Sequence, residues 1–228
     1  MNIAMLIPAA GVGSRMQADR PKQYLQLHGK TVLEHTINKL GSIPCCRAIW
    51  VAISPADPYF SSLALPASVT RVDGGAERAD SVLAGLQAID AEIYPWTLVH
   101  DAARPLVHVT DVMRLIEQCL QTGQGGILAS PVRDTMKRGA LTVEGQTLVD
   151  HTVERQQLWH ALTPQLFPTL QLRQALQQAL AQGVAITDEA SAMEWAGHPV
   201  QLVAGRADNL KITQPEDLAL AAFYLERQ

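Results

Sequence analysis

The sequence predicts an α/β protein with a mostly parallel sheet, helices on both faces of the sheet and a projecting β-arm. Short apolar runs alternate with amphipathic helical patterns along most of the chain, and this alternation is typical of a parallel sheet. One segment, at about residues 134–150, breaks the alternation and predicts the arm. The 228 residues contain no repeat, low-complexity tract or linker, so we expect residues 1–228 to form a single domain with this arm appended.

The expected strands are apolar runs short enough to cross a buried sheet. They lie at Ile3–Ile7, Ala48–Ile53, Val69–Val72, Thr97–His100, Gly126–Ser130 and Val200–Val203. The helical patterns place apolar residues three or four positions apart, at Leu33, Ile37 and Leu40, at Val82, Leu86 and Ile89, and at Val112, Leu115, Ile116 and Cys119. Capping-box spacing predicts helix starts at two pairs, Thr31 with Glu34 and Thr213 with Glu216.

The segment that breaks the pattern has β-branched residues around Gly139 and Gly145 and no amphipathic helix. It is too irregular to extend the central sheet. It is also too apolar to project freely into water, because it carries two leucines and two valines, at Leu141, Val143, Leu148 and Val149. We therefore expect each arm to pack on its twin in a two-fold homodimer.

Composition excludes several classes of protein. The net charge of −4 argues against a general nucleic-acid surface, and no apolar run approaches the roughly 20 residues of a membrane span. The apolar N-terminus has no basic region, so it does not predict a signal peptide. The three cysteines and seven histidines lack disulfide or metal-ligand spacing, so zinc is not indicated and a reducing, cytoplasmic setting is the simplest expectation.

The run PAAGVGSRM directly follows the first expected strand and forms a glycine loop where ligands bind in open α/β sheets. Gly11 and Gly13 resemble a dinucleotide fingerprint, but methionine occupies the position of its third glycine, and no Gly-Lys-Ser/Thr ending makes a P-loop. What remains is a flexible backbone able to surround phosphate oxygens, with Arg15 and Lys22 supplying charge. A glycine turn with solvated basic residues is the alternative.

Three further places hold candidate site residues. Asp101 ends an expected strand and is either a turn former or a hard oxygen ligand for Mg²⁺. The run VDGGAERADSV offers two glycines for close approach of a flat base and Ser81 for a hydrogen bond to it, although a glycine turn before a helix explains the same residues. Lys211 lies in NLKIT, where a lysine in a strand beside the core is seldom unpaired. Thr187 and Asp188 can cap a helix near residue 189.

Several motifs together resemble one family. The runs are PAAGVGSRM, RPKQYLQL, VDGGAERADSV, VHDAARP, SPVRDTMKR, LWHALTPQ, ITDEASAMEW and GRADNLKITQPEDL. In this order, and over nearly the whole chain, they closely resemble the 2-C-methyl-D-erythritol 4-phosphate cytidylyltransferases among the sugar-phosphate nucleotidyltransferases. The resemblance implies the Rossmann-like nucleotide-diphospho-sugar transferase fold and a homodimer joined through the β-arm. It also implies transfer of CMP from CTP to methylerythritol phosphate, with release of pyrophosphate and with Mg²⁺ as cofactor, in the non-mevalonate isoprenoid pathway.

The resemblance also carries residue roles over to this sequence. It implies that Arg15 and Lys22 are the catalytic cations. The nucleotide-binding residues would be Ala9, Ala10, Gly11, Gly13, Gly74, Gly75, Ser81, Asp101 and Ala102, with Asp101 also binding the metal. The sugar phosphate would be positioned by Arg155, Lys211, Thr163, Thr187 and Thr135, the last in the adjoining arm. Arg104 is either structural or substrate-facing, and the sequence leaves open whether Arg155 and Thr135 serve their own or a partner's site.

The implied reaction fits the absence of a general-base motif. A phosphate monoester has a second pKa of about 6 and is already mostly a dianion at neutral pH. The protein must then hold two anions together and neutralise charge on the α-phosphate and leaving group. Two alternatives remain at this point: a cytidylyltransferase for another polyol phosphate, such as ribitol 5-phosphate, and a nucleotide-binding module without turnover.

Overall fold

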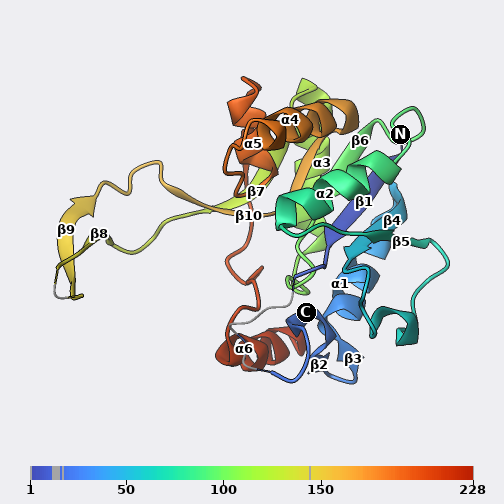
Figure 1. The fold of residues 1–228 in the computed structure, drawn as a ribbon, viewed down its shortest axis with the longest axis horizontal. Coiled ribbons are helices and arrows are strands. Elements are labelled where there is room, and N and C mark those ends of the chain that lie inside the picture. The colour runs from blue at the N-terminus through green and yellow to red at the C-terminus, as the bar shows by residue number, and fades with distance from the viewer. Residues whose placement is uncertain (1, 12–15, 17, 144, 228) are drawn as a thin grey trace.

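The protein is built around a seven-stranded sheet in the order β11-β7-β10-β6-β1-β4-β5 (Figure 1). This computed structural model describes residues 2–11, 16, 18–143 and 145–227. The strands of the sheet are β1 (Ile3–Pro8), β4 (Cys46–Ile53), β5 (Val69–Asp73), β6 (Trp96–Val99), β7 (Gly126–Pro131), β10 (Trp159–Pro168) and β11 (Gln201–Ala204). All neighbouring pairs are parallel except those of β10, which runs antiparallel to β6 and β7. The predicted mostly parallel sheet is confirmed.

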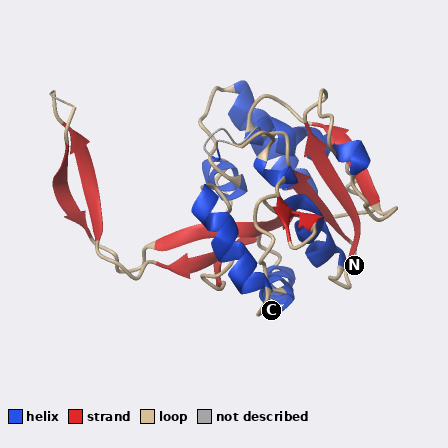
Figure 2. Ribbon diagram, turned by 90° about the horizontal axis from the view of Figure 1, so that it is seen from below, coloured by secondary structure: helices blue, strands red, loops and turns tan. Residues whose placement is uncertain are grey.

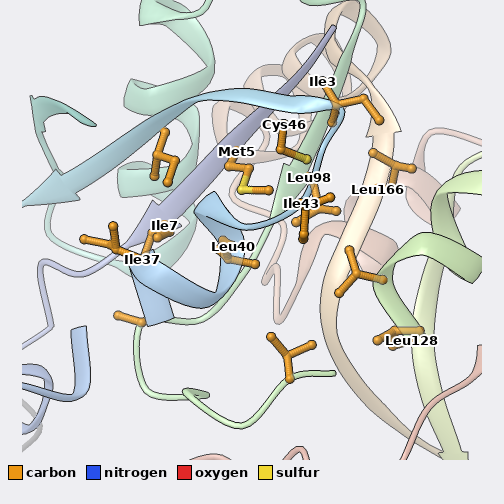
Figure 3. Packing of buried hydrophobic residues seen from close by; sticks show 14 of the residues in the cluster. Ile3, Met5, Ile7, Ile37, Leu40, Ile43, Cys46, Leu98, Leu128 and Leu166 are labelled. Carbon is orange, nitrogen blue, oxygen red and sulfur yellow. The ribbon is translucent and has the colours of Figure 1, made fainter. Parts of the chain in front are cut away.

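Helices cover both faces of this sheet, as the sequence predicts. One face packs against α1 (Val32–Gly41) and α3 (Val109–Thr122), through a cluster that Figure 3 shows around Met5, Ile7 and Leu98. The other face packs against α2 (Arg78–Ala88), α4 (Thr169–Ala181) and α5 (Glu189–Trp195). The last helix, α6 (Pro215–Leu225), belongs to a smaller third cluster. The remaining short elements are η2 (Lys22–Tyr24), β2 (Gln26–Leu27), β3 (Lys30–Thr31) and η3 (Phe60–Ser62).

The central strand β1 explains why its sequence is apolar without alternation. It pairs with β4 on one side and β6 on the other, and helices cover both of its faces, so residues 3–7 are completely buried. Helix α2 approaches this strand closely, because a Cβ atom built on Gly85 would overlap the side chain of Leu6. The strand therefore places the start of the glycine loop, residues 9–11, at a fixed point at the carboxyl end of the sheet.

The helix caps match the sequence predictions in two of three places. Thr31 caps α1 in a capping box with Glu34, and Asp188 caps α5 by accepting a 2.9 Å hydrogen bond from the N–H of Ser191. The predicted box of Thr213 with Glu216 is wrong, since Gln214 is the N-cap of α6 and Asp217 is its partner. Pro215 accounts for the shift of one residue, because proline suits the first helical position.

The arm is an antiparallel hairpin of β8 (Met136–Leu141) and β9 (Thr147–Val153) that projects away from the body (Figure 2), and its register shifts between Arg138 and Gly139. It forms a two-stranded sheet of its own, and its second strand runs three residues beyond the predicted end of the arm at residue 150. Its four large apolar side chains are exposed, Val143 completely and Leu141 by 76%. No helix in the described part of the chain has the length and apolarity of a membrane span.

Candidate active site

A pocket of about 330 Å³ lies at the carboxyl ends of β1, β5 and β6, a volume within the range of about 300–1,000 Å³ typical of small-molecule sites. Seven of the predicted nucleotide-binding residues line it: Ala9, Ala10, Gly11, Gly75, Ser81, Asp101 and Ala102. Lys22 and Lys211 line it as well, so a predicted catalytic cation and a predicted acceptor-binding cation meet in one cavity. The predicted residues Gly13 and Arg15 lie outside the described residues.

The wall formed by the β5–α2 connection depends on its glycines. Gly75 donates its backbone N–H to the Ser81 hydroxyl at 3.1 Å, and that hydroxyl donates in turn to the carbonyl of Glu77 at 3.1 Å. A Cβ atom on Gly74 would lie 2.8 Å from the Ser81 hydroxyl oxygen and 2.9 Å from the Cβ of Ala10. These contacts are those of a glycine turn before a helix, and they also bring the turn up against the loop that follows β1.

Asp101 is the centre of a buried charge cluster at the floor of the pocket. Its carboxylate accepts hydrogen bonds from the Nε atoms of Arg78 and Arg104, at 3.1 and 3.3 Å, and lies 3.0 Å from Nζ of Lys211. Burial of the carboxyl opposes its ionisation, but the three cationic neighbours outweigh burial and hold the pKa of Asp101 well below its usual range. Asp101 is therefore a permanent anion that holds three cations together.

Lys211 owes its position to the backbone around it. The structure corrects the expectation of a strand here, because the NLKIT segment has no regular secondary structure. Instead the N–H of Ile212 donates to the carbonyl of Ala103 at 2.9 Å, which ties the segment to the loop after β6. The expected partnering of Lys211 is confirmed, and its partner is Asp101.

Two charged residues of this site, Arg78 and Glu189, were not found from the sequence. Arg78 lines the pocket and donates two further hydrogen bonds, of 2.6 and 3.1 Å, to the carboxylate of Glu189, which is only 1% exposed. Burial disfavours the charge of Arg78, but its two acidic partners outweigh burial and raise its pKa. Arg78 and Glu189 begin α2 and α5, each inside a motif of the sequence, but nothing in a single sequence pairs residues 111 positions apart.

Thr163 and Arg104 lie beneath the pocket rather than on its wall. The Thr163 hydroxyl accepts the backbone N–H of Asp101 at 3.1 Å, and Arg104 donates to the carbonyl of Asn209 at 2.6 Å. Both residues are buried, with exposures of 4% for Thr163 and 8% for Arg104. In this structure they hold Asp101 in place, so the structural alternative for Arg104 is the one that its contacts favour.

The other predicted acceptor-binding residues are not brought into the pocket. Thr187 is exposed at the start of α5, where its backbone N–H donates to the hydroxyl of Ser191. Thr135 and Arg155 are exposed at the base of the arm, and the Arg155 guanidinium donates to the carbonyl of Arg133. None of the three lines the cavity that contains Lys22 and Lys211.

The residues present fit a magnesium ion only if substrate oxygens complete its coordination. Three of the roughly four lone-pair directions of the Asp101 carboxylate are taken by nitrogen donors, which leaves one. The described residues contain no cluster of three or more carboxylate, histidine or cysteine side chains able to hold a metal. Mg²⁺ in nucleotide sites commonly uses one or two carboxylates together with phosphate oxygens. Asp101 suits that arrangement as a single protein ligand.

Comparisons with known proteins agree on one family. The family model described as 2-C-methyl-D-erythritol 4-phosphate cytidylyltransferase matches residues 3–227. A cytidylyltransferase of that name from Photobacterium profundum is 59% identical over 99% of this chain and 97% of its own, and one from Vibrio parahaemolyticus is 60% identical over 98% and 95%. The crystal structure of the Francisella tularensis protein of the same name superposes with a TM-score of 0.81 at 36% identity, covering 98% of this chain and 99% of that one. This chain belongs to the 2-C-methyl-D-erythritol 4-phosphate cytidylyltransferase family.

Proposed function

We propose that this chain transfers the cytidylyl group of CTP to the phosphate of 2-C-methyl-D-erythritol 4-phosphate. The products are 4-diphosphocytidyl-2-C-methyl-D-erythritol and pyrophosphate, in the non-mevalonate route to isoprenoid precursors. The observation that carries the proposal is the family match over residues 3–227. The pocket supports it, because its cations meet at the carboxyl edge of the sheet, where nucleotides bind in open α/β folds.

The chemistry asks the protein for positioning and charge rather than for a base. An oxygen of the acceptor phosphate attacks the α-phosphorus of CTP, and the bond from that phosphorus to the bridging oxygen of pyrophosphate breaks. The acceptor phosphate is already mostly a dianion at neutral pH, so no proton has to be removed from it. Cations that face the α-phosphate and the leaving group lower the barrier by neutralising the charge that develops there.

The contacts of Lys22 and Lys211 support one role for each lysine, charge neutralisation for Lys22 and positioning of the acceptor for Lys211. Lys22 donates to the carbonyl of Ile212 at 2.9 Å, and Lys211 directly precedes Ile212, so the two lysines belong to adjoining parts of the pocket wall. Lys22 takes the catalytic role, together with Arg15 from the glycine loop. Lys211, held by Asp101, positions the acceptor phosphate.

Magnesium would be held by Asp101 and by phosphate oxygens of CTP. When bound there it supplies a Lewis acid that neutralises triphosphate charge. The residues Ala9, Ala10, Gly11 and Gly75 supply backbone close to the nucleotide, and Ala102 presents a small side chain to the ribose. Ser81 then offers its hydroxyl to the base.

We also propose that the active protein is a homodimer joined through the arms. The support is the exposure of four large apolar side chains on a hairpin that pairs with no other strand in the described part of the chain: Leu141, Val143, Leu148 and Val149. Thr135 and Arg155 lie at the base of this hairpin and outside the pocket. An arm that packs on a second copy can carry one or both of them to the partner's acceptor site.

A panel of acceptors tests the proposed function. Pyrophosphate release is measured with CTP and Mg²⁺ and, in turn, methylerythritol phosphate, ribitol 5-phosphate and other small polyol phosphates, and the nucleotide product is identified by mass. We expect turnover with methylerythritol phosphate to exceed that with every other acceptor. Faster turnover with ribitol 5-phosphate would reassign the substrate, and no release with any acceptor would leave a nucleotide-binding module.

A further inference from the structure

The buried side-chain amide of Gln23 connects the loop after β1 to the turn that carries Lys22. Gln23 lies in η2 directly after Lys22, and its residue is only 3% exposed. Its Nε2 atom donates to the carbonyl of Ala9 at 2.7 Å and to the carbonyl of Gly11 at 3.1 Å. The loop that leaves β1 is therefore tied at two points, on either side of Ala10, to the residue beside the catalytic lysine.

The turn that carries Gln23 is itself firmly held. On one side, Lys22 donates to the carbonyl of Ile212 at 2.9 Å. On the other, Tyr24 is 2% exposed, and its hydroxyl donates to a carboxylate oxygen of Asp57 at 2.9 Å. Burial, with Asp57 beside the hydroxyl, raises the pKa of Tyr24, so this group stays a neutral donor at any working pH. An amide fixed in this way can act as a rigid anchor for the loop.

The hydrogen bonds of Gln23 also determine which way the loop presents its polar groups. A trans peptide points its C=O and N–H in opposite directions, so the bond to the carbonyl of Ala9 turns the N–H of Ala10 away from Gln23. That N–H has no acceptor among the described residues, and Ala10 lines the pocket. The carbonyl dipoles, which would repel a triphosphate, are engaged with the amide, and an N–H remains available to an anion.

We propose that Gln23 is a positioning residue that fixes the start of the glycine loop, residues 9–11, relative to Lys22 and so sets the geometry of the triphosphate. The inference rests on the proposed cytidylyl transfer and names a further residue that this reaction needs. Gln23 lines the same pocket, and its side-chain amide donates to the backbone of the loop. Its loss should lower kcat more than it weakens the affinity for CTP, because the remaining loop still binds phosphate but holds it out of line with Lys22.

The substitution Gln23→Glu tests this inference with almost no change of shape. At pH 8 the new carboxylate cannot donate and faces two carbonyl oxygens, so we expect kcat to fall by about 10- to 100-fold, the cost of misplacing a reacting group. Burial raises the pKa of such a carboxyl, and its protonated form donates again. The ratio of variant to wild-type kcat should therefore rise as the pH is lowered from 8 to 6.

Two other variants complete the experiment. Gln26→Glu makes the same chemical change at an exposed position three residues further on and should leave kcat and both KM values unchanged. Gln23→Met keeps the length of the side chain but has neither a donor nor a charge, so its kcat should be lowered at every pH. This variant tests the role of the donor even if Gln23→Glu does not fold at pH 8. The melting temperature of each variant reports folding, and KM is measured for CTP and methylerythritol phosphate separately.

The outcomes separate this inference from the proposed function. If the wild-type protein releases no pyrophosphate from CTP with methylerythritol phosphate, the proposed function is overturned. If the wild type is active and both Gln23 variants keep kcat within about twofold of it, Gln23 has no positioning role. A folded Gln23→Glu variant whose kcat is reduced by the same factor at pH 6 and pH 8 also overturns the inference, because restoring the donor would then not restore the rate.

Discussion

Replacing Asp101 by asparagine should destabilise the protein as well as inactivate it. The carboxylate lies 3.0–3.3 Å from three cationic nitrogens. At an effective dielectric constant of about 20, each of these pairs attracts with about 5 kcal/mol. Desolvation of the charges and repulsion among the cations offset most of that attraction. Removing one partner of a buried ion pair typically costs about 3–5 kcal/mol, because charge is left uncompensated. We expect Asp101→Asn to lower the free energy of unfolding by that amount.

Urea denaturation of the apo proteins measures this loss, and its pH dependence identifies the cause. Because the pKa of Asp101 is lowered in the folded state, its stabilisation is complete above its usual pKa and is lost only in stronger acid. The difference between wild type and variant should thus be constant from pH 6 to pH 8. Asp73→Asn is the control, because Asp73 is 66% exposed in its pair with Arg71 and should cost less than about 1 kcal/mol. A loss from Asp101→Asn no larger than the control's would refute the charge-cluster argument.

Three further outcomes follow from other parts of the molecule. Lys22→Ala should lower kcat by roughly 10²- to 10³-fold while calorimetry shows little change in CTP binding, and an unchanged kcat would remove Lys22 from the mechanism. Shortening residues 139–145 to a tight turn should give a monomer by sedimentation with a raised KM for methylerythritol phosphate; a monomer with wild-type turnover would show that each site is complete in one chain. Burial lowers the pKa of His100 to about 4, so the folded state resists a proton that the unfolded state accepts near pH 6.5. Unfolding free energy should therefore fall by about 3 kcal/mol between pH 6.5 and pH 4 relative to His100→Asn, and parallel curves would contradict this.

The central sheet was predictable because its strands are buried on both faces. Each of the six predicted strands is present, with ends that differ by at most two residues, and each of the three predicted apolar helix faces packs on the sheet. Besides the short elements η2, β2, β3 and η3, two longer elements were not found from the sequence. Strand β10 is antiparallel and begins with half-exposed and exposed residues, so it lacks a continuous apolar run. Helix α4 buries Ala175 and Ala179 beside its leucines, and alanines among glutamines give a weak amphipathic signal.

Part of the site could be predicted from local sequence, and the rest depends on residues that are distant in sequence. The loops around Gly11, Gly75 and Asp101 follow strands directly, so their meeting at one edge of the sheet follows from the strand pattern. The charge cluster does not follow from it, because Glu189 and Lys211 reach Arg78 and Asp101 across more than a hundred residues of sequence. The hydrogen bonds from Gln23 to the start of the glycine loop were also not predicted, because a glutamine beside a lysine matches no known motif. Both were visible only once the backbone placed the partners together.

The connection of the arm to the sheet makes the arm a separable module. Strands β7 and β10 are neighbours that pair antiparallel from Pro131 opposite Trp159, and the N–H of Val132 donates to the carbonyl of Leu158 at 2.9 Å. Topologically, β7, the arm and β10 are one long hairpin whose outer end leaves the sheet. The pairing of β7 with β10 ends before the arm begins, so insertions or deletions at the tip of the arm need not disturb the pocket in the body. Evolution can therefore alter the tip of the arm without rebuilding the pocket at the carboxyl edge of the sheet.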